Sequence, residues 1–117
     1  MVTAREAFMW KKLREKYGLV GEVASRYVAA GYSVCIGVES SGYKIDFIAS
    51  RSNERLCVKI YTSSSKTSVD DIELFKKTCE KLRAKPVLIL YGRKTVLPGD
   101  VFEKTRELGV SIKRVKP

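Results

Sequence analysis

Two neighbouring strands predicted near the middle of the chain place a carboxylate beside lysines. Residues 43–49 and 56–61 each alternate apolar and polar side chains, which is the period of a strand with one buried face. One face then carries the apolar residues Ile45, Phe47, Val58 and Ile60. The other face carries Lys44, Asp46, Lys59 and Tyr61. A carboxylate next to a lysine at one height of a sheet is the layout of a metal-dependent nuclease site, in which the carboxylate binds Mg²⁺.

The elements that must position these strands follow from hydrophobic periodicity and turn residues. Two helices are expected first, over 3–17 and 19–30, ended by Gly18 and Gly31. Strands are expected over 33–38, 43–49, 56–61, 86–91 and 110–115, with helices starting at Ser68 and spanning 100–108. The unbroken apolar run of 86–91 is typical of a strand covered on both faces.

This order of elements, α-α-β-β-β-α-β-α-β, predicts an α/β fold. The expected architecture is a mixed β-sheet flanked by helices, because an initial meander is followed by crossover helices. The whole chain, 1–117, is expected to be a single domain, with a basic N-terminal helix over 1–18 and a core over 19–117.

The chain carries a large excess of positive charge. Its 117 residues contain 23 Lys and Arg against 13 Asp and Glu, a formal net charge of +10. Such a surplus favours a polyanionic partner such as nucleic acid, because neutralisation of phosphates supplies much of the binding free energy. The alternative is a charge that serves only solubility.

Missing residue types exclude several kinds of chemistry. The sequence has no His, which excludes His-dependent triads, zinc hydrolases and His-based ribonuclease mechanisms. Cys35, Cys57 and Cys79 lack CxxC spacing and are expected to be buried hydrophobes in a reducing cytoplasm. No apolar run is long enough to span a membrane, so a soluble, cytoplasmic protein is expected. The absence of Gln and the single Asn are reminiscent of heat-adapted proteins.

The order of elements and three short segments resemble the restriction-endonuclease-like superfamily, and most closely the archaeal Holliday junction resolvases. The segments are 31–34 (GYSV), 45–49 (IDFIA) and 56–61 (LCVKIY), and the resemblance covers residues 20–91. It implies a site built from a helix carboxylate, an aspartate that opens the second strand and a Glu-x-Lys pair on the third. It also implies Mg²⁺ as cofactor, DNA as partner, and either a homodimer or a subunit of a larger complex.

Only one residue of that implied site matches. Asp46 takes the place of the aspartate, whereas Lys59 stands where the Glu is expected, Tyr61 where the Lys is expected and Val20 where the helix carboxylate is expected. An ammonium group repels a divalent cation, so Lys59 is expected to pair with Asp46 instead. A single carboxylate seldom holds Mg²⁺ without further ligands. The sequence therefore predicts a degenerate site without a cofactor, in a protein that binds structured DNA.

Three alternatives stay open. Lys44, Lys59 and Glu39 could rebuild a variant Mg²⁺-dependent endonuclease with Asp46 as the metal ligand. The chain could be a non-catalytic subunit of a larger enzyme of the tRNA-splicing endonuclease kind, which shares a related fold. Asp46 and Lys59 could also form only a cross-strand salt bridge.

Phosphate contacts are expected mainly from two loops, 62–67 and 92–94, which combine small residues with cations. The full predicted set is Lys44, Lys59, Lys66, Arg93, Lys94, Lys11 and Lys12. The helix lysines could equally be a solvated surface. No segment resembles a base-reading helix, so binding is expected to follow nucleic-acid shape, with DNA favoured over RNA.

Overall fold

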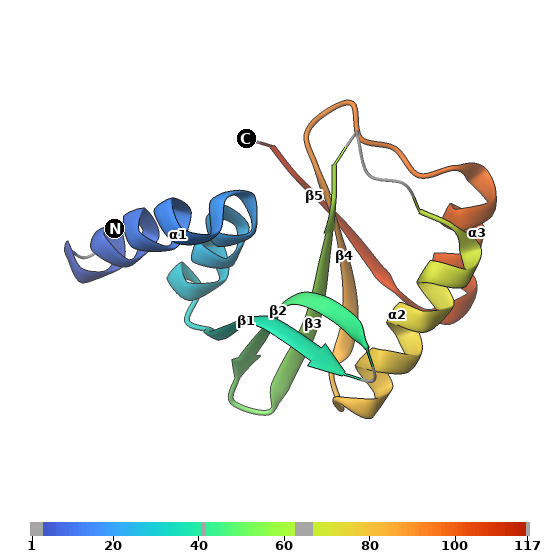
Figure 1. Cartoon of the computed structure of the whole chain (residues 1–117), viewed down its shortest axis with the longest axis horizontal. Helices are drawn as coiled ribbons and strands as arrows, with labels where there is room; N and C mark the ends of the chain where they lie inside the picture. The colour runs from blue at the N-terminus through green and yellow to red at the C-terminus, as the bar shows by residue number, and fades with distance from the viewer. Residues whose placement is uncertain (1–3, 41, 63–66, 117) are drawn as a thin grey trace.

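The computed structural model describes residues 4–40, 42–62 and 67–116. Its elements are α1 (Ala4–Ala29), β1 (Ser33–Ser40), β2 (Tyr43–Arg51), β3 (Glu54–Tyr61), α2 (Val69–Lys81), β4 (Lys85–Tyr91), α3 (Gly99–Leu108) and β5 (Ser111–Val115). The predicted elements are all present. The two predicted N-terminal helices are the two parts of α1, which is interrupted at Gly18 by non-helical angles (φ 57°, ψ −127°). Figure 1 shows the part of α1 before Gly18 projecting away from the sheet.

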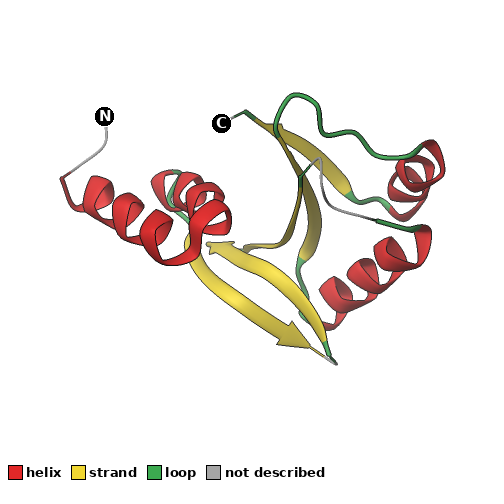
Figure 2. Cartoon of the chain, turned by 45° about the horizontal axis from the view of Figure 1, so that its top comes forward, coloured by secondary structure: helices red, strands yellow, loops and turns green. Residues whose placement is uncertain are grey.

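The five strands form one mixed sheet in the order β1-β2-β3-β4-β5. β1, β2 and β3 are antiparallel neighbours, whereas β3, β4 and β5 run parallel. The parallel pairs require the crossovers that α2 and α3 provide. Helices cover both faces: α1 lies on one side of the sheet, and α2 and α3 lie on the other (Figure 2). The predicted α/β architecture of a mixed sheet flanked by helices is thus confirmed.

Two apolar cores lie on the two faces of this sheet. The α1-side core contains Val23 and Ala24 of the helix, and the α2-side core contains Ile72 and Phe75. Strand β4 contributes to both: Val87 and Ile89 to the α1-side core, Leu88 and Leu90 to the α2-side core. The prediction of a strand covered on both faces is confirmed.

Local signals mark the ends of α2 and α3. The Ser68 hydroxyl accepts a hydrogen bond from the Asp71 amide at 3.2 Å, which caps α2 as expected. Gly109 ends α3 in the left-handed conformation at φ 72°.

Of the cysteines, Cys57 and Cys79 are buried, but the expected burial of Cys35 is wrong, because its side chain lies on the exposed face of edge strand β1. None of the helices in the described part of the chain is long and apolar enough to cross a membrane.

The alternation predicted for β2 is wrong at one point. Phe47 belongs to the α1-side core, but Ile45 belongs to the α2-side core, although both residues were expected on one face. Strand β1 changes side at the same height, with Ile36 against the α1-side core and Val38 against the α2-side core. The recorded pairing joins Ile36 to Phe47 and Val38 to Ile45, so the change of side falls between these pairs.

The physical reason for this change of side is a local break in both strands. Gly37 lies between the two pairs on β1 and has φ 77°, a conformation that costs little only for glycine. Asp46 lies between them on β2 and uses its side chain to bond the neighbouring strand. The tip of the β1–β2 hairpin is thereby turned towards α2, as the bent pair of strands in Figure 1 shows.

Candidate functional site

Asp46 sits where strands β2 and β3 separate. Its Oδ2 atom accepts a hydrogen bond from the backbone N–H of Ile60 at 2.6 Å. The recorded β2–β3 pairing runs from Arg51 opposite Glu54 to Phe47 opposite Val58 and ends there. Beyond that pair the carboxylate takes the place of a backbone carbonyl as the acceptor for Ile60. One of the two carboxylate oxygens of Asp46 is therefore already engaged in a hydrogen bond within the protein.

The environment of Asp46 favours its neutral form. Burial raises the pKa of its carboxyl group above the ordinary value of 3.8, whereas the bond from the Ile60 amide and the charge of Lys59 act in the opposite direction. The effect of burial is larger than the combined effect of the Ile60 amide and Lys59, because the carboxylate loses contact with water when the chain folds.

Lys59 does not form the expected ion pair. Its Nζ atom donates to the backbone carbonyl of Lys44 at 3.1 Å and lies 5.1 Å from the centre of the Tyr43 ring. It is near enough to Asp46 to lower the pKa of that group, but among the described residues its direct polar partner is the Lys44 carbonyl. The predicted salt bridge is therefore replaced by a bond to a neutral acceptor beside an aromatic ring.

Tyr61 is a buried residue of the α2-side core, with 5% of its surface exposed. Its hydroxyl donates to Asp71 Oδ2 near the start of α2. The Tyr43 hydroxyl donates to the other oxygen, Asp71 Oδ1, at 3.4 Å. Burial, followed by the interactions with Asp71, raises the pKa of both tyrosines far above 10. Both hydroxyls therefore stay protonated donors.

Asp71 is the participant that the sequence interpretation missed. It lies in the first turn of α2, where a negative charge is favourable at the positive end of the helix dipole. The crossover from β3 brings it back against Tyr61, ten residues earlier, and Tyr43, twenty-eight residues earlier. No local pattern in the sequence relates these three residues.

The carboxylates of this region do not converge on one point. Glu39 pairs in register with Lys44 across β1 and β2, and its side chain is exposed. Among the described residues no group of three His, Cys, Asp or Glu is close enough to hold a metal ion. Asp46, the predicted metal ligand, belongs to no such group in the described part of the chain.

The remaining predicted binding residues divide between two places. Arg93 and Lys94 are exposed and follow the end of β4, in a loop that Arg114 holds through bonds to the carbonyls of Gly92 at 2.6 Å and Arg93 at 3.2 Å. Lys11 and Lys12 belong to α1 before Gly18, where only the helical backbone is described. Lys66 lies outside the described residues.

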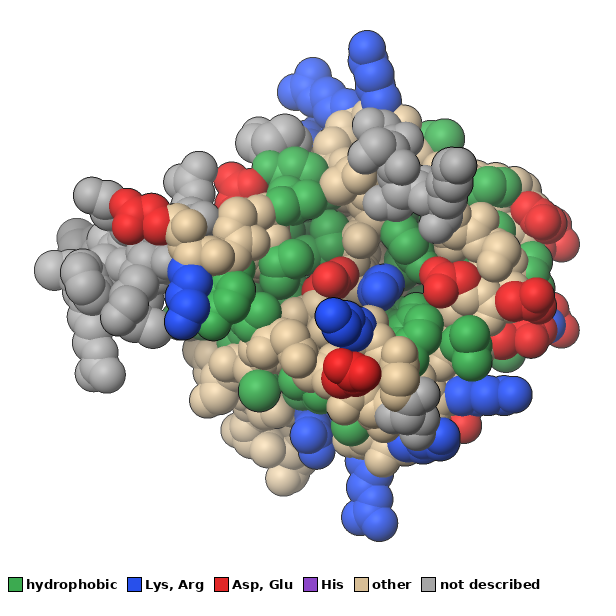
Figure 3. Space-filling view, viewed as in Figure 1, with side chains coloured by type: hydrophobic (Ala, Val, Ile, Leu, Met, Phe, Trp, Pro, Cys, Tyr) green, Lys and Arg blue, Asp and Glu red, His purple; other side chains and the backbone are tan. Residues whose placement is uncertain are grey.

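Charge is unevenly spread over the face seen in Figure 3. Lys and Arg side chains project from the upper and lower edges, whereas acidic side chains gather on the right, over α2 and α3. Two ion pairs in that acidic area join Lys104 to Glu73 at 3.1 Å and to Glu107 at 3.6 Å. The acids of that area are therefore partly used within the protein.

Comparison with known proteins supports the fold class. No family model matches the chain, and no curated protein matches it. Its structure is similar to the crystal structure of AF1548, described as a protein of unknown function, with a TM-score of 0.61 and 16% sequence identity. The match covers 79% of this chain and 54% of that one, so the chain spans about half the length of AF1548. The protein is thus an α/β protein with a mixed five-stranded sheet.

Proposed function

We propose that this protein binds structured nucleic acid, DNA in preference to RNA, and does not cleave it. The binding surface would be the edge of the sheet where β3 and β4 end and β2 begins, called here the carboxyl edge and made of Lys44, Lys59, Arg93 and Lys94. β3 and β4 are parallel, so Arg93 and Lys94 follow β4 at the edge that Lys59 approaches on β3. β2 is antiparallel to β3, which returns Lys44 to the same edge.

The proposal that the protein does not cleave nucleic acid depends on the contacts that Asp46 and Lys59 make in the structure. One oxygen of Asp46 is bonded to the Ile60 amide, and the ammonium group of Lys59, which the resemblance aligns with the second metal-binding carboxylate, is near Asp46. Metal-dependent phosphodiester cleavage needs an ion held by several oxygen ligands, which activates water and neutralises developing charge. Lys59 repels such an ion and attracts a phosphate.

The same arrangement supports a degenerate member of the restriction-endonuclease-like superfamily. The mixed sheet, the aspartate near the start of β2 and the replaced pair on β3 are the features on which this assignment depends. A homodimer or a non-catalytic position in a larger complex would suit such a protein, and both belong to this proposal.

Binding can be tested by fluorescence anisotropy with labelled four-way junction, duplex and single-stranded DNA and with duplex RNA. We expect junction or duplex DNA to bind best and the affinity to fall steeply with salt, because each phosphate contact adds roughly 0.9 to the slope of log K against log salt. The double variant Arg93→Glu/Lys94→Glu should reduce that slope by about 2.

A matched control lies at the other end of the same strands. Arg55 and Lys85 are exposed cations near the beginnings of β3 and β4, so Arg55→Glu/Lys85→Glu changes the net charge equally but away from the carboxyl edge. Equal weakening by both double variants would show nonspecific charge attraction and contradict the proposed surface. Indifference to every nucleic acid, together with binding to a partner protein, would favour a scaffold subunit.

The non-cleaving part is tested with the same substrates in Mg²⁺ or Mn²⁺. We expect intact substrate with the wild type. Cleavage that requires the metal and is abolished by Asp46→Ala would establish the variant endonuclease instead and overturn this part of the proposal.

A further inference from the structure

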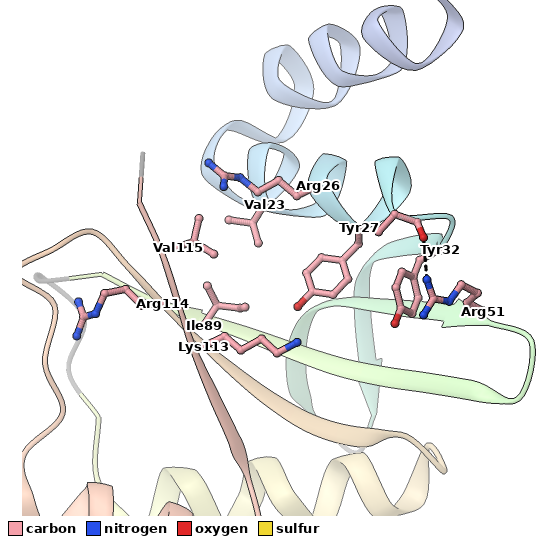
Figure 4. Close-up of a pocket in the computed structure, with 10 residues that line it drawn as sticks. Val23, Arg26, Tyr27, Tyr32, Arg51, Ile89, Lys113, Arg114 and Val115 are labelled. Carbon is pink, nitrogen blue, oxygen red and sulfur yellow. Dashed lines mark hydrogen bonds between the residues drawn. The ribbon is translucent and has the colours of Figure 1, made fainter. Parts of the chain in front are cut away.

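A second basic site lies on the opposite side of the sheet from Asp46. It is a cavity of about 370 Å³ between the second half of α1 and strands β4 and β5 (Figure 4). Its lining residues are Val23, Arg26, Tyr27, Ala30, Tyr32, Arg51, Ile89, Lys113, Arg114 and Val115. Four of these are cations and none is an acid. This is the size of a pocket for a small organic molecule.

Hydrogen bonds to backbone carbonyls hold two of the cations around this cavity in place. Arg26 donates to the carbonyl of Lys116 at 2.9 Å, and Arg51 donates to the carbonyl of Ala30 at 2.9 Å. A backbone carbonyl is a neutral acceptor, so both guanidinium groups are held in place and keep their full charge. Arg51 also pairs with Glu54 at 3.7 Å, in a half-exposed pair that contributes little, and the same carboxylate accepts a hydrogen bond from the Tyr32 hydroxyl at 3.1 Å.

Lys113 is the cation most directly aimed into the cavity. Figure 4 shows its side chain extending from β5 towards Tyr27 and Tyr32, whereas Arg114 of the same strand points away from them. This follows from the alternation of a strand, since Arg114 donates to the carbonyls of Gly92 and Arg93 on the other side. An anion beside the tyrosines would therefore meet Lys113 first, whereas Arg26 lies across the cavity on α1 with its guanidinium directed away from Tyr27.

The remaining walls are apolar and aromatic. Val23 and Ile89 are buried beneath the cavity, with 0% and 1% of their surfaces exposed. The rings of Tyr27 and Tyr32 meet edge to face at 5.5 Å, and the Arg51 guanidinium lies over the Tyr32 ring at 4.4 Å. Such walls bind flat organic rings through stacking and apolar contact. A bare inorganic anion would leave most of this volume and all of these contacts unused.

We propose that this cavity binds a nucleoside phosphate, with the phosphate at Lys113 and the base beside Tyr27 and Tyr32, over the apolar floor of the cavity. The ligand chemistry has two sources, a free mononucleotide or the phosphorylated end of a nucleic-acid strand. The site goes beyond the proposed function, because its residues lie on the other face of the sheet from Lys59 and Asp46.

The test is isothermal titration of the whole chain with adenosine 5′-monophosphate, adenosine, inorganic phosphate, and a short single-stranded oligonucleotide with or without a 5′-phosphate. Adenosine monophosphate is expected to bind at least tenfold more tightly than adenosine or phosphate alone. Lys113→Ala should weaken it about tenfold, since it removes the charged contact to the phosphate. Lys85→Ala, at a distant exposed lysine, should leave it unchanged.

The outcomes separate the two sources and the two proposals. Tighter binding of the 5′-phosphorylated oligonucleotide identifies a strand end, and tighter binding of the mononucleotide identifies a free ligand. Failure of every nucleotide probe, or equal weakening by Lys85→Ala, overturns the site. Arg93→Glu/Lys94→Glu belongs to the carboxyl edge and should not alter binding of the mononucleotide, so either proposal can fail without the other.

Discussion

The two faces of the sheet differ in the charged groups that they bring together. On the α2 side, the carboxylates of Asp46 and Asp71 accept hydrogen bonds from protein donors: the Ile60 amide and the hydroxyls of Tyr61 and Tyr43. On the α1 side, Arg26 and Arg51 donate to backbone carbonyls and keep their charge available. The first face thus combines bonded acids with Lys59, whereas the second has a cavity lined by four cations and by no acid.

This contrast explains why a resemblance to a metal site does not produce one. A carboxylate binds Mg²⁺ well only when its oxygens and its neighbours are free to act as ligands. Here Asp46 and Asp71 accept hydrogen bonds from Ile60 and Tyr61, and these bonds also connect β2 to β3 and β3 to α2. The cations are restrained by neutral acceptors, which is the arrangement that suits phosphate recognition.

The largest expected effect comes from removing the acceptor of the Ile60 amide. Asp46→Ala leaves this buried N–H without its partner and should lower the free energy of unfolding by about 1–3 kcal/mol. Asp46→Asn keeps an oxygen at the same place and should cost much less. Urea unfolding of both variants measures the difference, and equal losses would show that Asp46 acts through its charge and not through this bond.

Replacing Lys59 by an acid should increase the affinity of the region around Asp46 for a divalent ion. Lys59→Glu places a second carboxylate near Asp46, so Mg²⁺ or Mn²⁺ should stabilise the variant by about 1.4 kcal/mol when the ion is at ten times its dissociation constant. The melting temperature with and without the ion is the measurement. Lys59→Gln is the control, and a wild type stabilised equally by the ion would contradict the role given to the ammonium group.

The two tyrosines that share Asp71 should differ in their contributions. Tyr61→Phe removes the closer hydroxyl and should cost about 1 kcal/mol, whereas Tyr43→Phe removes a bond of 3.4 Å and should cost less. Thermal unfolding of the two single variants and the double variant tests this order. A larger loss of stability from Tyr43→Phe would show that Tyr43, and not Tyr61, makes the stronger hydrogen bond to Asp71.

A smaller effect is expected from pH. The pKa of Asp46 is higher in the folded protein than the ordinary 3.8, so its contribution to stability is present at low pH and lost as pH rises through the folded value. Asp46→Asn lacks this titration. The stability of the Asn variant relative to wild type should therefore increase as the pH rises above the ordinary pKa of 3.8. A relative decrease would show that Lys59 and the Ile60 amide outweigh burial.

The order of elements and most of their ends were predictable because local residues encode them. Gly18 interrupts α1, Ser68 caps α2 and Gly109 ends α3, each through its own backbone or side-chain chemistry. The apolar run of β4 likewise indicated a strand covered on both faces. Prediction of Asp46 and Lys59 as neighbours was also correct, since the pKa of Asp46 responds to Lys59.

The partners of these residues depended on the tertiary structure. The period of two could not show that Ile45 and Phe47 lie on different faces, because that follows from Gly37 on one strand and the Asp46 bond to another. The meeting of Asp71 with Tyr43 and Tyr61 requires the crossover into α2, and the basic cavity requires α1 to pack over β4 and β5. The sequence by itself determined the elements and the net charge, whereas folding decided which charges are satisfied, because hydrogen bonds between distant residues exist only once the chain is packed.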